Sequence, residues 1–342
     1  MVNLNKASRE LFSRPPDECF ESLDALLAHC FRMREQSADR WQPPREIRST
    51  AADGPLMLEL GPEDVYSMND WSFTQLCRLA GVAKDTVNRL TPETADQVLR
   101  ETLPSGSRPV QLLTTDEIVR SIHGVSYSRL WNADLLTAIR EEATDFSPPP
   151  KGANGGTGLY CGEQDMFSFL IDPAGWIEIG QQTFAPGFFV WNSEVGRRSV
   201  GIQTFWFQAV CQNHLVWDAC QIVEFSRKHT GNVSESLGEI RRIVADLVAK
   251  RDARRDEFAR VIQKAIQEKV GADDDEAKEF LTKHGIPRSL VRKAVETIAR
   301  QGAPFTLWSL VDVLTQITGA IPFAGDRTEA DQKVAKLLAM AA

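Results

Sequence analysis

Two short polar segments interrupt the most apolar part of this sequence, and they contain the residue types best suited to binding an anion. The first segment, residues 191–199, reads WNSEVGRRS and includes Asn192, Glu194, Arg197 and Arg198. Paired guanidinium groups suit a phosphate or a carboxylate, because each planar fork can donate two parallel hydrogen bonds. A nearby carboxylate or imidazole would supply acid/base chemistry. The same letters also fit a solvated turn, in which Asn and Ser bond the backbone and Gly forms the bend.

The second segment, residues 225–232, reads FSRKHTGN and contains Arg227, Lys228 and His229. Four of the five basic residues between positions 151 and 232 fall in these two segments. That clustering predicts a joint ligand site, with two unrelated solvated turns as the alternative. Our predicted site for a nucleic acid or another anion therefore comprises Asn192, Glu194, Arg197, Arg198, Arg227, Lys228 and His229.

Aromatic residues lie just before, inside and after the first segment, and they suggest what the anion belongs to. Alternating aromatics close to arginines are what a base-stacking groove needs, since every nucleobase offers a π-face. Alternation along a strand also places about half of such residues in a core, so not all six are expected to face a ligand. The residues are Phe188, Phe189, Trp191, Phe205, Trp206 and Phe207.

Several other kinds of site are not favoured by the sequence. The glycine-rich stretch GANGGTG at 152–158 has no strand before it and no Lys-Ser/Thr after it, so it predicts a loop rather than a phosphate cradle. The five histidines never occur four apart on one helix, and no HExxH motif is present. Cys211 lies near His214, but it stands inside an apolar run and is predicted to be a core thiol. We predict no metal and no cofactor.

Composition sets further bounds on function. The net charge of −8 and the pI near 5.3 give no overall basic field, so nucleic-acid contact would need a local patch. Neither a secretory h-region nor an apolar run of 18 residues is visible, so a cytoplasmic location without membrane contact is expected. The six cysteines are scattered without a CxxC pair, which indicates reduced thiols: Cys19, Cys30, Cys77, Cys161, Cys211 and Cys220.

The elements that must position these residues fall into three stretches, which we predict as 1–107, 108–232 and 233–342. The first is helical and loop-like, and its segment 71–92, WSFTQLCRLAGVAKDTVNRLTP, predicts a helix-turn-helix corner bending at Gly81. The second helix of that corner exposes an acidic residue, and residues 1–110 carry more acids than bases. Sequence-specific DNA reading is therefore disfavoured, because a recognition helix enters a polyanionic groove.

The middle stretch, 108–232, alternates and is rich in β-branched and aromatic residues, which predicts strands. It contains one helix, beginning at the expected capping residue Asn132. The last stretch, 233–342, predicts one amphipathic helix of more than 30 residues followed by shorter helices. The predicted fold class is α+β: a mostly antiparallel sheet flanked by helices.

The arrangement of motifs resembles the DUF932 family, also called the phage/plasmid-like protein family, which occurs on prophages, plasmids and integrative elements. The matching segments are VRSIHGVSYSRLWNADLL, FFVWNSEVGRRSVGI, FWFQAVCQNHLVW, FSRKHTGN and SLVDVLTQITGAIPFAGDRTEADQKVAKLLA, which cover most of the chain from about residue 70. His214 stands where the family pattern often has Gly. The resemblance implies a mobile-element setting and carries no catalytic residues with it.

Three functions remain open from the sequence. The first is a mobile-element accessory protein that binds or anneals single-stranded nucleic acid, with a homo-oligomer as the expected assembly. The second is an enzyme acting on a nucleotide or another anionic small molecule, with Glu194 or His229 as acid/base and Arg197 and Arg198 as the anion clamp. The third is a protein–protein adaptor that uses the long C-terminal helix.

Overall fold

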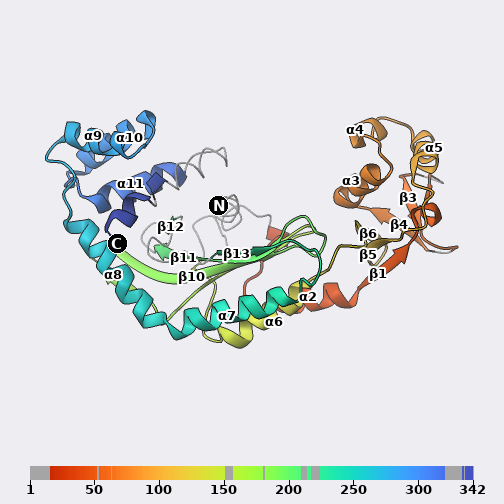
Figure 1. The fold of residues 1–342 in the computed structure, drawn as a ribbon, viewed down its shortest axis with the longest axis horizontal. Coiled ribbons are helices and arrows are strands. Elements are labelled where there is room, and N and C mark those ends of the chain that lie inside the picture. Colours follow the sequence, from red (N-terminus) through yellow and green to blue (C-terminus); the bar gives the residue numbers. More distant parts are fainter. Residues whose placement is uncertain are drawn as a thin grey trace.

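The computed structural model describes residues 16–51, 54–62, 64–150, 157–179, 182–208, 214–216, 224–319, 333–334 and 336–341. Two sheets and their flanking helices confirm the α+β class. All strand pairs among the described residues are antiparallel except one, the parallel pair β4–β6. Figure 1 shows an N-terminal lobe and a helical C-terminal lobe at opposite ends of a long central sheet. No helix in the described part of the chain is long and apolar enough to cross a membrane.

The N-terminal lobe is built on a six-stranded sheet with the order β1-β5-β6-β4-β3-β2. Strands β5 and β6 come from just after the predicted boundary at residue 107, yet they pair with strands from before it. The core of the lobe lies between the sheet and helices α3 and α5. The strands are β1 (Ser37–Gln42), β2 (Arg48–Thr50), β3 (Met57–Glu59), β4 (Val65–Met68), β5 (Val110–Thr115) and β6 (Ile118–Gly124), and the helices are η2 (Pro44–Glu46), α3 (Asp70–Leu79), α4 (Lys84–Val87) and α5 (Pro92–Thr102). The short η1 (Pro16–Glu18) lies instead beside the central sheet, since Cys19 after it bridges to Tyr160.

The helix-turn-helix-like corner predicted for 71–92 corresponds to α3, a turn and α4. Gly81 occupies the turn with a φ of +69°, a left-handed conformation that favours glycine. However, α4 spans only four residues, and its Lys84 forms an ion pair with Asp70 of α3. A recognition helix lays several side chains along the major groove, so one helical turn gives sequence-specific reading no support.

The central sheet has the order β12-β11-β10-β8-β7, with β13 paired to β11 and β9 paired to β10. The long hairpin of β10 and β11 forms its middle, because both strands are buried along nearly their whole length. The strands are β7 (Leu159–Cys161), β8 (Met166–Ile171), β9 (Ile177–Ile179), β10 (Gln182–Asn192), β11 (Val200–Gln208), β12 (His214–Val216) and β13 (Glu224–Arg227).

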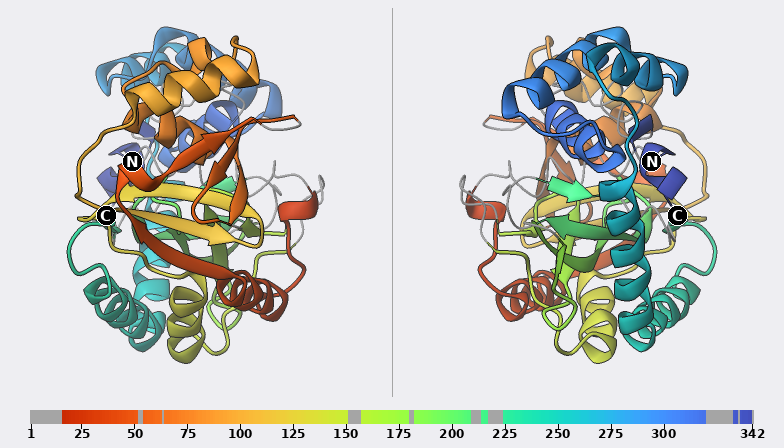
Figure 2. Two further views of the ribbon diagram at one scale, coloured as in Figure 1. Left: turned by 90° about the vertical axis from the view of Figure 1, so that its right-hand side faces the viewer. Right: turned by 90° about the vertical axis from the view of Figure 1, so that its left-hand side faces the viewer.

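Three helices cover one face of the central sheet: α2 (Leu23–Glu35), α6 (Asn132–Glu142) and α7 (Glu235–Ala249). Both views of Figure 2 place them together beneath the sheet. Their apolar stripes pack against Leu170, Val190 and Ile202 of the strands. Burial of these apolar stripes stabilises the helices, as is usual for amphipathic helices.

The six aromatics at positions 188–207 that suggested a base-stacking groove are all buried, so that interpretation is wrong. Each is at most 4% exposed, because both faces of the sheet are covered at these positions. Phe188 faces the helix layer, whereas Phe189 and Phe205 lie in an aromatic cluster on the other face. Trp206 stacks on Phe258 with ring centroids 3.8 Å apart.

The single long helix predicted after residue 233 is interrupted at Lys250, which ends α7 and precedes α8 (Arg251–Gln267). The ψ of Lys250 is +13°, which departs from the helical value. The residues around Lys250 are polar, so this part of the chain has no apolar face that packing would hold in one continuous helix. The two helices therefore pack into different hydrophobic cores, α7 under the central sheet and α8 in the C-terminal lobe.

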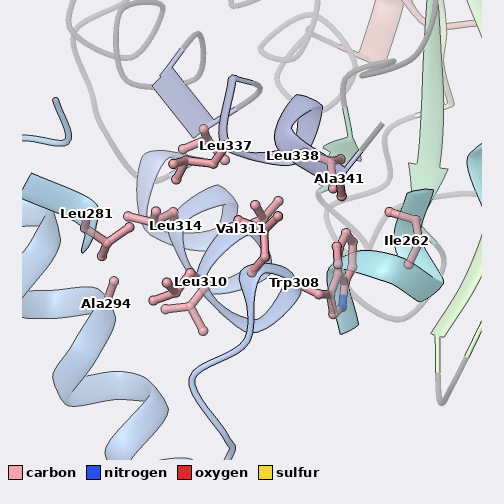
Figure 3. Packing of buried hydrophobic residues seen from close by; sticks show 14 of the residues in the cluster. Ile262, Leu281, Ala294, Trp308, Leu310, Val311, Leu314, Leu337, Leu338 and Ala341 are labelled. Atoms are coloured by element: carbon pink, nitrogen blue, oxygen red, sulfur yellow. The ribbon is translucent and has the colours of Figure 1, made fainter. Parts of the chain in front are cut away.

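The C-terminal lobe contains α8, α9 (Asp274–Lys283), α10 (Arg288–Gln301), α11 (Leu307–Gly319) and the short η3 (Ala339–Ala341). Figure 3 shows Leu310, Val311 and Leu314 of α11 lying between α10 and the final residues Leu337 and Leu338. The three shorter helices predicted for this region are confirmed. The acidic run before α9 caps it, since the Asp273 carboxylate accepts hydrogen bonds from the amides of Asp275 and Glu276.

Candidate functional site

Strand register brings the two polar segments to the same end of the central sheet. In the pair β11–β13, Val200 lies opposite Arg227 and Gly201 lies opposite Ser226. The turn at 193–199 therefore enters β11 where the segment 228–232 leaves β13. The hydroxyl of Ser226 donates to that of Ser199 at 2.8 Å, which ties the two segments directly. The two segments are therefore neighbours in space, and a joint ligand site on them stays a prediction.

A third segment, residues 127–132, joins the two turns. The hydroxyl of Tyr127 donates to the carbonyl of Glu194 at 2.8 Å. The ring of Tyr127 stacks between His123 and His229, with centroid distances of 3.7 and 5.7 Å. The backbone of Ser128 completes the contact, donating to the carbonyl of His229 and accepting from its Nδ1. Three segments far apart in sequence thus form one junction.

Both histidines of this junction are held neutral. Burial lowers the pKa of His229 and the pKa of His123 to about 4, and the nearby Arg129 guanidinium acts in the same direction. Because the Nδ1 of neutral His229 donates to Ser128, its Nε2 is an acceptor. That Nε2 is buried without a hydrogen-bond partner, and His229 is only 5% exposed.

Glu194 is committed to internal contacts. Its Oε1 accepts the backbone N–H of Asn132 at 2.9 Å, and its Oε2 lies 3.2 Å from Nη1 of Arg120. The side chain is 2% exposed. Asn132 is the first residue of α6 rather than its capping residue, so the predicted cap is corrected: the cap position is Trp131, and the carboxylate comes from Glu194. A carboxylate at this position favours the helix, whose free N–H groups carry partial positive charge.

Asn192 also supports the junction from within. It is fully buried, and its amide donates to the carbonyl of Leu130 and to the side chain of Asn132, both at 2.8 Å. The side-chain amide of Asn132 in turn lies 3.8 Å from the sulfur of Cys161. These bonds hold the start of α6 against the end of β10.

The two arginines predicted as a clamp point to different partners. Arg198 is 12% exposed along its side chain, lies over Phe167 and contacts Asp165 at 2.5 Å. Arg197 is exposed, and its guanidinium lies 4.8 Å from the centroid of the Trp71 ring. The structure thus separates these neighbours and leaves Arg197 at the surface.

The remaining two predicted cations are exposed at the adjacent segment. Arg227 pairs with Glu235 at 3.3 Å, and both side chains are largely solvated. Such a solvated ion pair contributes little to stability, so another anion can replace Glu235 at Arg227 at little cost. Lys228 is exposed beside it.

A surface pocket of about 330 Å³ is lined in part by His123, which contacts the turn that carries Arg197. The link is the carbonyl of Val195, which accepts from Nε1 of Trp71 at 2.8 Å and from Nε2 of His123 at 2.9 Å. His123 forms part of the pocket wall, and Arg78 of α3 is exposed on its other side. The lining residues are Gln75, Arg78, Leu79, Val110, Ile122, His123 and Gly124.

Sequence reasoning missed Arg120, Tyr127, Arg129 and Trp71 as members of this region. Arg120 lies in a strand and is 7% exposed, and a buried arginine needs a charge partner that composition cannot identify. Tyr127 and Arg129 lie in the segment VRSIHGVSYSRLWNADLL, where no spacing or charge cluster indicated a site. Trp71 was assigned to the helix-turn-helix corner, although its indole faces the 191–199 turn.

Three earlier predictions fall on residues outside the described ranges or at their edge. Most of the 152–158 loop and Cys211 lie outside the described residues, and no side-chain contact is described for His214. Among the residues that the structure describes, no group of three or more His, Cys, Asp or Glu side chains could hold a metal ion.

Comparison with known proteins gives one assignment. Neither the curated proteins nor the solved structures contain a significant match to this chain. Residues 172–336 match the sequence profile described as "Domain of unknown function (DUF932)". The match includes both polar turns and the helices through α11, but it excludes Arg120, Tyr127 and Asn132, so it is shorter than the resemblance noted from residue 70. Residues 172–336, slightly less than half of the chain, are therefore similar to the DUF932 family.

Proposed function

We propose that the protein binds single-stranded nucleic acid at the surface formed by Trp71, Arg78, Arg197 and the pocket beside them. We name this surface the α3 groove. The observation that carries the proposal is the exposed Arg197 guanidinium, which lies over the Trp71 ring at a turn that also contacts the wall of an apolar pocket. A cation next to an aromatic ring and an apolar recess matches the backbone and base of a single strand.

The spacing along α3 supports this arrangement. Trp71 and Arg78 are two turns apart on the same helix, which places them about 10 Å apart along its axis. Arg197 at one end and Arg78 at the other offer two phosphate contacts. The floor between them includes Leu79, Val110 and Ile122, which suits a flat, apolar base.

The electrostatic surroundings do not oppose a phosphate. Among the described residues, neither Arg197 nor Arg78 forms an ion pair with a carboxylate. Lys228 and the solvated Arg227 extend the cationic character beyond Arg197. An exposed cation gains from replacing phosphate counterions, and this gain depends on salt.

The setting of this function is also part of the proposal. The family resemblance favours a protein of a prophage, plasmid or related mobile element, working in the cytoplasm on its single-stranded intermediates. We also propose that the protein works as a homo-oligomer.

The enzyme alternative receives less support from the geometry. Both carboxylate oxygens of Glu194 have partners, and Arg198 pairs with Asp165. An acid/base group must reach a substrate, and an anion clamp needs free donors. The adaptor alternative relied on one long helix, and α7 and α8 bury separate apolar stripes inside the protein.

Fluorescence anisotropy with a labelled oligothymidylate tests the proposal. We expect binding at low salt, and we expect the double variant Arg78→Ala/Arg197→Ala to bind at least about tenfold more weakly, because two phosphate contacts are lost. The slope of log K against log salt should become shallower by about 1.4, since each contact on a single strand contributes roughly 0.7. Arg292→Ala on α10, an exposed arginine of the other lobe, is the matched control and should bind like wild type.

Two outcomes would overturn the nucleic-acid proposal. One is absence of binding by the wild-type protein at low salt. The other is equal loss of affinity in the double variant and the Arg292→Ala control, because a general charge effect does not require the α3 groove.

A further inference from the structure

Two cysteines that are far apart in sequence meet beneath the central sheet. Cys30 belongs to α2 and Cys161 ends β7, and their thiols are hydrogen-bonded to each other. Both are free thiols, and both lie in the core between the sheet and its helix layer. They are separated by 131 positions of chain, so only the folded protein brings them together.

The two thiols differ in access to solvent. Cys161 is 9% exposed and lines a cavity of about 310 Å³, whereas Cys30 is 1% exposed and is not part of that lining. His29, the residue next to Cys30, lines the same cavity. A small molecule entering the cavity therefore reaches Cys161 and the His29 ring before it can reach Cys30.

The hydrogen bonds polarise the pair. Hydrogen bonds from the Cys30 thiol and from His29 lower the pKa of Cys161 below the ordinary thiol value, although burial opposes them. The same hydrogen bond to Cys161, together with burial, raises the pKa of Cys30. A thiolate is the reactive form of cysteine, so the accessible sulfur is also the more nucleophilic one.

We propose that Cys161 and Cys30 form a peroxide-reactive dithiol, with Cys161 as the attacking thiol and Cys30 as the resolving thiol. This site lies on the helix side of the junction and does not depend on nucleic-acid binding.

The reaction proceeds in two balanced steps. The Cys161 thiolate attacks one oxygen of a hydroperoxide, the O–O bond breaks, and the products are a sulfenic acid on Cys161 and water or an alcohol after the leaving oxygen takes a proton. The Cys30 sulfur then attacks the Cys161 sulfur, the S–O bond breaks, and a disulfide and a second water form. The hydroperoxide is reduced by two electrons, and the two thiols are oxidised by two.

The cavity lining favours a neutral oxidant over an anionic one. Four acidic residues line it, and its one arginine, Arg120, is already paired with Glu194. An anionic disulfide such as oxidised glutathione meets like charge there, whereas hydrogen peroxide carries no charge. The acidic lining residues are Asp17, Glu18, Asp116 and Glu163.

Peptide mapping of the full-length protein under non-reducing conditions tests the proposal directly. After brief treatment with a small excess of hydrogen peroxide, we expect one disulfide-linked pair of peptides that contains Cys30 and Cys161. Thiol titration of the unfolded protein should show two fewer free thiols. Oxidised glutathione at the same concentration should react at least tenfold more slowly.

Variants separate the roles of the two sulfurs. In Cys30→Ser the sulfenic acid on Cys161 cannot be resolved, so dimedone should label Cys161 in that variant and not in the wild type. In Cys161→Ser no peroxide-dependent disulfide should form at Cys30. Cys77→Ser and Cys19→Ser are matched controls that remove other thiols, and each should still form the Cys30–Cys161 bond.

Three results would overturn the proposal. They are a wild-type protein that keeps all its thiols under peroxide, a disulfide between any other pair such as Cys19 and Cys161, and dimedone labelling at Cys77 equal to that at Cys161. The mapping uses unaltered protein, so misfolding of a variant does not hide the outcome.

Discussion

The carboxylate of Glu194 accepts the backbone N–H of Asn132, the first residue of α6, across 62 positions of sequence. Its other oxygen faces the guanidinium of Arg120 from β6 of the N-terminal sheet. One side chain from the end of β10 therefore joins the two sheets and caps a helix. Such a buried contact is sensitive to loss of either partner, because the remaining charge has no water to stabilise it.

We predict that Glu194→Gln lowers the free energy of unfolding by about 3 kcal/mol, because Arg120 is then left buried and unpaired. Urea unfolding followed by circular dichroism measures the change. Replacing both residues, as Glu194→Gln with Arg120→Met, should recover part of the loss, since neither charge remains. Glu239→Gln, which removes a surface pair on α7, should change stability by less than about 0.5 kcal/mol.

Gly196 provides a test of the close packing at the same turn. Its φ is +67°, and an added Cβ would lie 2.6 Å from Cε1 of His123 and 2.8 Å from Cε2 of Tyr127. We predict that Gly196→Ala destabilises by about 2–3 kcal/mol, from backbone strain and from displacement of the stacked rings. Gly231 has nearly the same φ, +66°, with open space around it. Gly231→Ala should cost only about 1 kcal/mol, and an equal cost at both positions would contradict the packing explanation.

The buried histidines predict a dependence of stability on pH. The pKa of His229 and of His123 is about 4 in the folded protein, below the ordinary 6.5 of an unfolded chain. Between pH 6.5 and about 4 the unfolded state binds more protons, so stability falls as the pH is lowered through this window and is constant above it. The loss is up to about 3 kcal/mol for each histidine. Urea unfolding at neutral pH and near pH 4.5 measures it, and His229→Gln should roughly halve the difference.

The ion pairs of Arg251, the first residue of α8, give a prediction about the stability of the bend between α7 and α8. Its guanidinium contacts Asp145 at 2.7 Å and Asp172 at 2.5 Å, and the side chain of Asp172 is 2% exposed. We predict that Arg251→Leu destabilises by about 2 kcal/mol or more, since Asp172 is left buried without a cation. Thermal unfolding measures this. Lys250→Ala, which removes only an exposed pair with Asp246, should unfold within a few degrees of wild type.

The polar turns were predictable from sequence because they are local features. Gly, Asn and Ser at 191–199 and 225–232 specify turns by their own backbone preferences and hydrogen bonds. Helix bounds such as those of α5 and α9 were predictable for the same reason, with Thr91 and Asp273 as caps. The sequence did not predict the break at Lys250. An apolar periodicity shows that a segment is helical, but it does not show which hydrophobic core each part of the helix packs into.

The sequence by itself determined the α+β class, the similarity of 172–336 to DUF932 and the two polar segments with their arginines, since these depend on local pattern and residue type. Only the tertiary structure decided which side chains meet. It separated Arg197 from Arg198, placed Trp71 under Arg197, and brought Cys30 to Cys161. Pairing across the sheets and burial beneath them are long-range properties, and no single stretch of sequence specifies the partner of a side chain.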